Sequence, residues 1–218
     1  PGEGGTHGVI HEVTTDDMAK LDAIEANYDR VEAKARLYDG TEQTVIVYKQ
    51  KQGAEKITGA NKPPTARYIE IIIEGCRQYR VNEEYISKLE AMECVPRVKP
   101  EEFISLPEPP EGSPTMTKDE LAKFNGKDGN RLGYSCNGKV IEITGNAPES
   151  LKTMSTRFAG KEITYYMACM LYDPLYGMPE SAKDMSEEHK KSIEHNLAIN
   201  LKAMEADPPV AKVVAMVV

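Results

Sequence analysis

A proline-rich segment near the middle of the chain is the feature that most limits how the sequence can fold. Residues 96–114 read PRVKPEEFISLPEPPEGSP. Proline fixes φ, lacks an N–H donor and restricts the residue before it, so neither a helix nor a central strand continues through this segment. A chain of 218 residues is long enough for two small domains. We therefore predict domains over residues 1–95 and 116–218, joined by a semi-extended linker over residues 96–115.

Composition indicates a soluble globular protein, with 40% hydrophobic and 28% charged residues. The net charge of -8 repels phosphate backbones, and no basic stripe with interleaved aromatic residues occurs, so we predict no nucleic-acid partner. No run approaches the roughly 18 apolar residues that span a bilayer, so no transmembrane segment is predicted.

The cysteines and histidines do not have the spacing of metal ligands. Cys76, Cys94, Cys136 and Cys169 are far apart and lack a CxxC pair, which favours buried thiols in a reducing intracellular compartment, cytoplasm or organelle matrix. The histidine pairs are His7 with His11, and His189 with His195. Neither spacing places both members on one face of its expected element. We predict no metal site.

The first half of the chain reads as an α+β domain. Thr14, with Asp17 three residues on, is expected to cap a helix over residues 15–26. Asp39-Gly40 is typical of a turn between two strands, the second of which (TVIVY) is apolar and expected to be covered. The helix over residues 66–79 is expected to bury one apolar face, formed by Tyr68, Ile71, Ile72, Gly75 and Tyr79. The predicted elements are strands Gly8–Val13, Val31–Tyr38 and Thr44–Lys49 and helices 15–26, 66–79 and 83–92.

The second half is also predicted to be α+β. Thr117 and Glu120 form a capping box. Asn137-Gly138 between two apolar runs is a strong signal for a two-residue hairpin. The predicted elements are strands Leu132–Cys136 and Lys139–Ile143, a helix from about Met154 to Leu171, and a helix that Ser186 opens with Ile193, Leu197, Leu201 and Met204 on one face.

The first half contains a G-V strand start, an L-D-x-x-E helix end and a later R-Y helix with a glycine. The residues of this pattern are Gly8, Val9, Leu21, Asp22, Glu25, Tyr28, Arg67, Tyr68, Gly75 and Tyr85. Together these motifs resemble those of the γ-glutamylcyclotransferase (AIG2-like) family over residues 8–92. The resemblance implies a mixed β-barrel or sheet with helices.

The same resemblance implies candidate site residues. The family's glutamate accepts a proton from the substrate α-amine, which then attacks the γ-amide carbonyl and closes a 5-oxoproline ring. That role falls on Glu25, with Tyr28 and Tyr68 as candidate substrate-binding residues. The sequence departs from the family at Ala26, where the family has Gly. It also begins after the place of a Y-G-S-N-L-type turn that holds the substrate carboxylate. We therefore expect the first strand and anion loop to be missing and the domain to be inactive.

The second half contains the segments MTKDELAKFNGKDGNRLGYSCNGKVIEIT and RFAGK. These segments resemble the membrane-associated progesterone receptor and neudesin family over residues 116–214. The resemblance implies a small cytochrome-b5-like α+β domain. The family binds haem through a tyrosine before F-A-G, where this chain reads APESLKTMSTR with Met154 as its single candidate ligand. We predict no haem and no other cofactor. Tyr165 and Tyr166 form part of an aromatic cluster that either lines an apolar ligand pocket or packs in the core.

Three functional hypotheses follow from these observations. The preferred one is a non-catalytic accessory subunit with protein partners in a larger assembly, in which the apolar tail Val213–Val218 adds to a partner as an edge strand. The alternative is a cyclotransferase that releases 5-oxoproline from γ-glutamyl peptides or amines through Glu25. A second alternative is binding of a small steroid-like ligand by the C-terminal domain.

Overall fold

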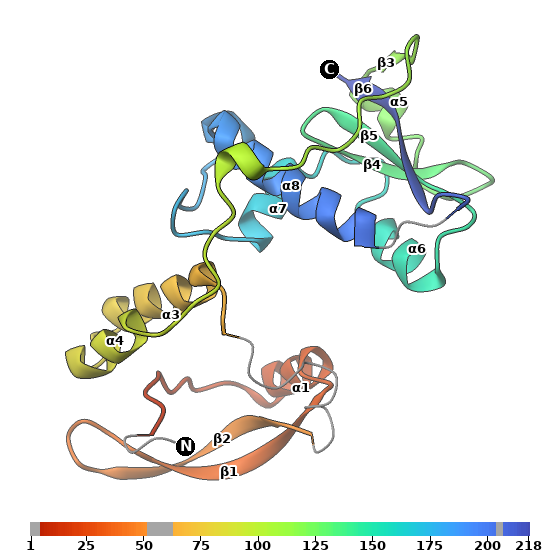
Figure 1. Cartoon of the computed structure of the whole chain (residues 1–218). Helices are drawn as coiled ribbons and strands as arrows, with labels where there is room; N and C mark the ends of the chain where they lie inside the picture. The colour runs from red at the N-terminus through yellow and green to blue at the C-terminus, as the bar shows by residue number, and fades with distance from the viewer. Residues whose placement is uncertain (1–4, 52–62, 204–206) are drawn as a thin grey trace. The chain divides into compact units, whose positions relative to one another are not determined.

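The computed structural model describes residues 5–51, 63–203 and 207–218, and the chain divides into two compact units (Figure 1). Unit 1 comprises Pro1–Pro96 and unit 2 comprises Arg97–Val218. Both contain helices and strands, so the chain is α+β. Each unit is described by itself.

Unit 1 contains a hairpin and three helices in its described part. The helices are α1 (Thr15–Ile24), α3 (Ala66–Gln78) and α4 (Glu83–Glu90), and the strands are β1 (Tyr28–Arg36) and β2 (Glu42–Gln50). The predicted cap of α1 is confirmed, because the Asp17 backbone N–H donates to Thr14 Oγ1 at 3.1 Å. The predicted turn at Asp39-Gly40 is also confirmed, with Tyr28 paired to Gln50 at the open end of the hairpin.

Two strand expectations for unit 1 were wrong. Residues 8–13 form no strand, because an extended segment becomes a strand only where another strand pairs with it. The described residues of the unit form a two-stranded sheet with helices, which is the sheet alternative of the expected fold. The apolar run in β2 is not covered, since Ile46 and Val47 are 43% and 41% exposed. An apolar run indicates a buried strand only where another layer of helices or strands packs against it.

Helices α3 and α4 pack through a small apolar core. Its members are Ile69, Ile73, Cys76, Val81, Ile86 and Leu89. The buried stripe of α3 is therefore not the predicted one, and Tyr68 and Tyr79 are 58% and 53% exposed. The amphipathic tyrosine ring tolerates the surface, whereas the β-branched isoleucines beside it are withdrawn from water.

Unit 2 contains a four-stranded sheet with the order β3-β6-β5-β4. Its elements are η1 (Pro100–Glu102), β3 (Thr115–Met116), α5 (Lys118–Leu121), β4 (Leu132–Cys136), β5 (Lys139–Ile143), α6 (Glu149–Thr156), α7 (Thr164–Met170), η2 (Ala182–Asp184), α8 (Glu187–Ala203) and β6 (Ala211–Val217). The predicted capping box and hairpin are confirmed. Asn137 and Gly138 both have positive φ, as a two-residue turn of this kind requires.

The apolar tail Val213–Val218 does not form a free edge. Strand β6 lies between β3 and β5, pairing parallel with one and antiparallel with the other. Val213 and Ala215 are buried. The prediction of an edge strand was wrong because a charge-light apolar run suits a covered central strand equally well.

The single helix predicted from Met154 to Leu171 is two helices, α6 and α7. Gly160 lies between them with a φ of +72°, and a Cβ added there would lie 2.9 Å from the carbonyl oxygen of Ala122. A left-handed residue in close contact with another segment ends a helix, and glycine adopts that conformation at least cost.

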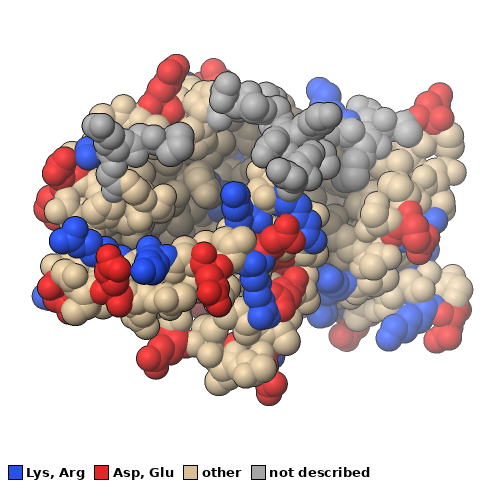
Figure 2. Space-filling model, turned by 90° about the horizontal axis from the view of Figure 1, so that it is seen from below, with Lys and Arg blue, Asp and Glu red and all other residues tan. Residues whose placement is uncertain are grey.

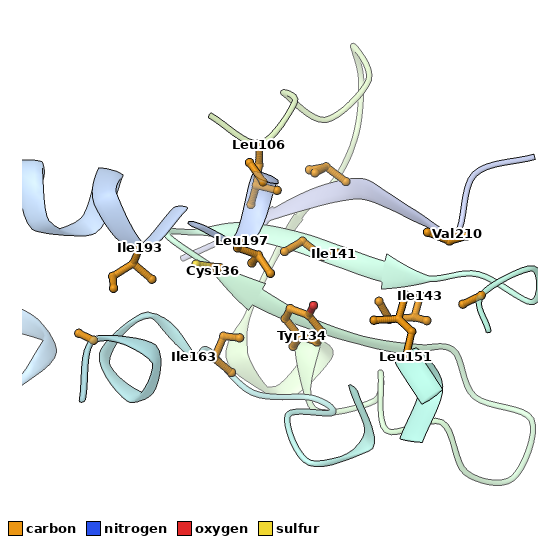
Figure 3. Packing of buried hydrophobic residues seen from close by; sticks show 14 of the residues in the cluster. Leu106, Tyr134, Cys136, Ile141, Ile143, Leu151, Ile163, Ile193, Leu197 and Val210 are labelled. Atoms are coloured by element: carbon orange, nitrogen blue, oxygen red, sulfur yellow. The ribbon is translucent and has the colours of Figure 1, made fainter. Parts of the chain in front are cut away.

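The main core of unit 2 lies between one face of the sheet and helices α6, α7 and α8 (Figure 3). The side chains labelled there include Tyr134, Cys136 and Ile141 from the sheet and Leu197 from α8. The opposite face of the sheet carries a smaller cluster, formed by Leu121, Phe124, Val140 and Ala215. The central strands are thus covered on both faces.

The proline-rich segment packs on unit 2. Leu106 is 3% exposed and belongs to the main core. The Ile104 backbone N–H donates to His195 Nδ1 at 2.9 Å, and Arg97 forms an ion pair with Asp173. These contacts make residues 97–106 part of the fold of unit 2.

Candidate functional site

The candidate site is the corner where helix α1 meets the open end of the hairpin. Glu25 is the C-cap residue of α1, and its backbone N–H donates to the Leu21 carbonyl at 2.8 Å. The Tyr28 N–H donates to the Glu25 carbonyl at 2.8 Å and starts β1. The Glu25 side chain is half-buried, and its carboxylate has no hydrogen bond or ion pair with any described residue.

Asp22, the other acid of the L-D-x-x-E motif, is engaged in a clasp between α1 and the hairpin. Arg30 donates to it through Nε at 2.6 Å and through Nη2. The hydroxyl of Tyr48 donates to Asp22 Oδ1 at 2.8 Å. Arg30 and Tyr48 are cross-strand partners, so the clasp fixes α1 against both strands. The two acids of the motif therefore have different surroundings.

The clasp shifts the protonation equilibria of its members. Hydrogen bonds from Arg30 and then Tyr48 hold the pKa of Asp22 below its ordinary value. The Asp22 carboxylate in turn raises the pKa of Arg30. The pKa of Tyr48 is raised mainly by loss of water contact and, to a smaller extent, by its hydrogen bond to Asp22. Asp22 therefore stays ionised and Tyr48 stays protonated across the physiological range.

We expect Asp22→Asn to lower the melting temperature of unit 1 near neutral pH and to matter less in acid. Because the folded-state pKa of Asp22 is lowered, its contribution is present above the ordinary carboxyl pKa and is lost as the pH falls through the lowered value. Thermal melts of variant and wild type between about pH 7 and about pH 3 measure this difference. Asp29→Asn, in the exposed part of β1, is the matched control. Equal effects of the two substitutions at every pH would contradict the clasp.

The structure places the two candidate tyrosines of unit 1 differently. Tyr28 is three residues after Glu25, joined to it by the turn, and is 41% exposed. Tyr68 lies on α3 and is 58% exposed. Among the described residues, no hydrogen bond or ring contact links Tyr68 to Glu25 or Tyr28. The corner thus contains Glu25 and Tyr28.

Lys51 is a residue of this corner that the sequence interpretation missed. Its backbone N–H donates to the Asn27 carbonyl at 3.2 Å, and its Nζ donates to the Ala26 carbonyl at 2.7 Å. The hairpin register could have identified it, since a turn at Asp39-Gly40 places Lys51 opposite Asn27. The same register pairs Arg30 with Tyr48, and these two residues were also missed because the register was not used.

A histidine–tyrosine cluster lies at the turn end of the hairpin, away from Glu25. His7 Nδ1 and the Tyr38 hydroxyl are 2.8 Å apart, and the His7 ring stacks on Tyr85 at 4.5 Å. The Asn82 backbone N–H also donates to the Tyr38 hydroxyl, at 3.0 Å. This cluster ties the first described residues to the turn and to α4. Within the described ranges, no group of three or more histidine, cysteine, aspartate or glutamate side chains is arranged to hold a metal ion.

In unit 2, the two candidate pocket tyrosines have different surroundings. The Tyr165 hydroxyl donates to the Glu180 carbonyl at 3.2 Å, and its ring packs against the core. Tyr166 is 51% exposed and contacts Phe158 edge-on, with 5.4 Å between ring centroids. The two tyrosines thus contact different residues, Glu180 for Tyr165 and Phe158 for Tyr166.

A buried ion pair is the main polar feature of unit 2. Lys139 Nζ donates to Glu194 Oε1 at 3.0 Å, to the Leu106 carbonyl at 2.7 Å and to the exposed Glu108 at 2.8 Å. Glu194 also accepts from the Leu106 N–H and from Asn137 Nδ2, both at 2.8 Å. Burial alone would lower the pKa of Lys139, but its two glutamate partners raise it overall. Each charge is therefore paired and hydrogen-bonded.

Met154, the candidate haem ligand of the sequence, lies at the surface of unit 2. Met154 on α6 is 48% exposed and lies outside the core cluster. Tyr134 is in the core, and burial raises the pKa of its phenol to about 12. Burial likewise raises the pKa of the Cys136 thiol to about 12. All four cysteines are free.

Charged side chains of both signs are interspersed on the face shown in Figure 2. On that face, a charged ligand would be selected by individual side chains instead of a broad field of one sign. None of the helices in the described ranges is both long and apolar enough to cross a membrane.

Unit 1 is thus an α+β unit, and at its helix–hairpin corner the Glu25 carboxylate has no hydrogen bond or ion pair with another described residue. Residues 6–89 match the model of the AIG2-like family. This segment is therefore an AIG2-like, γ-glutamylcyclotransferase-like domain, as the resemblance implied. Comparison with curated proteins and with solved structures gave no match. The family match ends before unit 2, whose cytochrome-b5-like character stays a prediction.

Proposed function

We propose that the AIG2-like domain is a γ-glutamyl cyclotransferase in which Glu25 is the general acid–base. The observation that carries this proposal is the contrast between the two acids of one motif. Asp22 is engaged by Arg30 and Tyr48, whereas the half-buried Glu25 carboxylate has no partner among the described residues. A proton acceptor must be free to meet its substrate, and Glu25 meets that condition.

The reaction moves two protons from the attacking nitrogen to the leaving nitrogen and needs no added reactant. Glu25 takes one proton from the substrate α-ammonium, and the amine lone pair forms a bond to the γ-carbonyl carbon. The C–N bond of the γ-amide then breaks, its electron pair goes to the leaving nitrogen, and Glu25 returns the proton there. The attacking nitrogen loses its second proton as it becomes the lactam nitrogen, and the released amine takes up a proton to become an ammonium. The products are 5-oxoproline and a free amine or amino acid. Holding the substrate folded supplies the orientation that this intramolecular attack requires.

The direct test is release of 5-oxoproline from a γ-glutamyl amino acid by the full-length protein, followed by liquid chromatography and mass spectrometry. We expect equal amounts of 5-oxoproline and free amino acid to accumulate with time. Release of free glutamate instead would indicate hydrolysis and would contradict cyclisation. Absence of any product would contradict catalysis.

A non-catalytic accessory role is the second candidate, and the hairpin supports it. Its apolar residues Tyr28, Ile46 and Val47 are each more than two-fifths exposed, and the described residues leave one edge of each strand unpaired. Exposed apolar strands suit a protein partner that adds a strand of its own. Sedimentation of the full-length protein and of Ile46→Glu tests this role by self-association. A monomer in both cases, together with 5-oxoproline release, would contradict it.

For unit 2 we propose a cytochrome-b5-like module that binds no haem. The support is the Asn137-Gly138 hairpin, the turn at Gly160 that ends the F-A-G segment and the exposed position of Met154. Titration with haem is expected to give no Soret band of a bound complex, and its appearance would contradict the proposal. We do not propose a steroid-like site, since Tyr165 and Tyr166 face different surroundings.

A further inference from the structure

We propose that Lys51 binds a carboxylate group of the γ-glutamyl substrate while Glu25 meets the substrate's α-ammonium. This inference rests on the proposed function and deepens it, because it names the residue that recognises the charged head of the substrate. It concerns a side chain outside the motifs that the sequence resemblance supplies.

The backbone fixes Lys51 beside the turn that carries Glu25. The last ladder pair of the hairpin joins Tyr28 to Gln50. The hydrogen bond from the Lys51 N–H to the Asn27 carbonyl extends this ladder by one residue. The turn between α1 and β1 therefore lies next to Lys51 along the open end of the hairpin.

The ammonium group of Lys51 keeps binding capacity in this position. It donates one hydrogen bond, to the Ala26 carbonyl at 2.7 Å, and an ammonium group has three donors. Lys51 is exposed and forms no ion pair with Glu25 or any other described carboxylate. The ammonium of Lys51 and the carboxylate of Glu25 thus lie at the same corner without pairing with each other.

Arg30, the other cation of this corner, is not available for a ligand. Its guanidinium binds both carboxylate oxygens of Asp22 and the Met18 carbonyl at 3.2 Å. Releasing it would break the clasp that holds α1 on the hairpin. Lys51 is the better candidate because its remaining donors can be used without breaking an ion pair.

A separated anion and cation are complementary to the zwitterionic head of an α-amino acid. Glu25 can accept from the α-ammonium, and Lys51 can donate to a carboxylate in a charge-assisted hydrogen bond. Two substrate carboxylates lie within a few bonds of the reacting nitrogen atoms. One is the α-carboxylate of the glutamyl group, and the other belongs to a leaving amino acid. Both have the same chemistry.

The experiment compares wild type with Lys51→Met on three substrates of the full-length protein. A γ-glutamyl amino acid has both carboxylates, a γ-glutamyl amine lacks the second, and a 4-aminobutanoyl amino acid lacks the first. We expect Lys51→Met to raise KM about 10- to 100-fold on substrates with the recognised carboxylate and to leave kcat nearly unchanged. Lys51→Arg should restore part of the loss, and Lys49→Met, an exposed lysine of the same strand, is the control.

The pattern of losses identifies the carboxylate. Losses on both γ-glutamyl substrates, with none on the 4-aminobutanoyl substrate, assign the α-carboxylate. Losses on both amino-acid conjugates, with none on the γ-glutamyl amine, assign the leaving group. An unchanged KM on every substrate, with Glu25→Gln inactive, would overturn the role of Lys51 alone.

Failure of the proposed function is distinguishable from failure of this inference. If wild type releases no 5-oxoproline, the proposed function fails, and calorimetric titration with the γ-glutamyl amino acid then decides the role of Lys51. Binding that is lost in Lys51→Met would support it. Absent binding, or equal affinity in both proteins, would overturn it.

Discussion

Glu25→Gln is expected to lower the kcat for 5-oxoproline release by about 100-fold or more. Glutamine preserves the size of the side chain but cannot take a proton from the α-ammonium or return it to the leaving nitrogen. Because the Glu25 carboxylate has no partner among the described residues, the substitution breaks no hydrogen bond or ion pair within that part of the chain. Steady-state kinetics on a γ-glutamyl amino acid, with circular dichroism as a check of folding, measure the effect.

The matched control for this variant is Glu32→Gln. Glu32 is an exposed acid of β1, in cross-strand register with Ile46. We expect it to retain wild-type kcat and KM. If Glu25→Gln turned over substrate as fast as Glu32→Gln, then Glu25 would not be the acid–base and the accessory role would be favoured.

Glu194→Ala is expected to lower the free energy of unfolding of unit 2 by about 3–5 kcal/mol. The substitution leaves Lys139 buried beside the exposed Glu108 alone, and it removes the acceptor of the Leu106 and Asn137 donors. Breaking a buried pair by removing one member costs more than replacing both members. Urea denaturation, followed by the signal of the unit 2 transition, measures the change.

Two further variants make the test of this ion pair specific. Glu187→Ala, on the same helix, removes an exposed pair with Lys190 and is expected to cost less than about 1 kcal/mol. Combining Glu194→Leu with Lys139→Met is expected to recover most of the lost stability. A Glu194→Ala protein as stable as Glu187→Ala would show that the buried pair contributes little.

The elements that were predicted correctly are those whose sequence signals, such as helix caps and hairpin turns, depend on neighbouring residues in the chain. Thr14 and Thr117 mark helix starts, and Asn137-Gly138 marks a hairpin, through contacts within a few residues. The errors concern elements whose state depends on distant partners. Residues 8–13 lack a pairing strand, whereas the tail Val213–Val218 has two.

The candidate site, like the fold, was predictable only where its residues belong to a local motif. Glu25 and Asp22 belong to a motif, but nothing in that motif distinguishes the unpaired acid from the clasped one. Arg30, Tyr48 and Lys51 reach the corner only through the pairing of two strands. In unit 2, Glu194 lies on a charged helix sequence between Ile193 and His195, and a glutamate in such a helix is more often solvated than buried.

The anchoring of the proline-rich segment decides where unit 2 begins as an independent folding unit. A truncated protein that started at residue 116 would lack the Leu106 side chain from its core and the Leu106 N–H and carbonyl from the Lys139–Glu194 network. It would also leave His195 without the Ile104 N–H. Separate expression of unit 2 therefore requires a start at or before Arg97. Insertions within residues 97–106 would disturb the folding of unit 2, because these residues are packed in it and do not form a free linker.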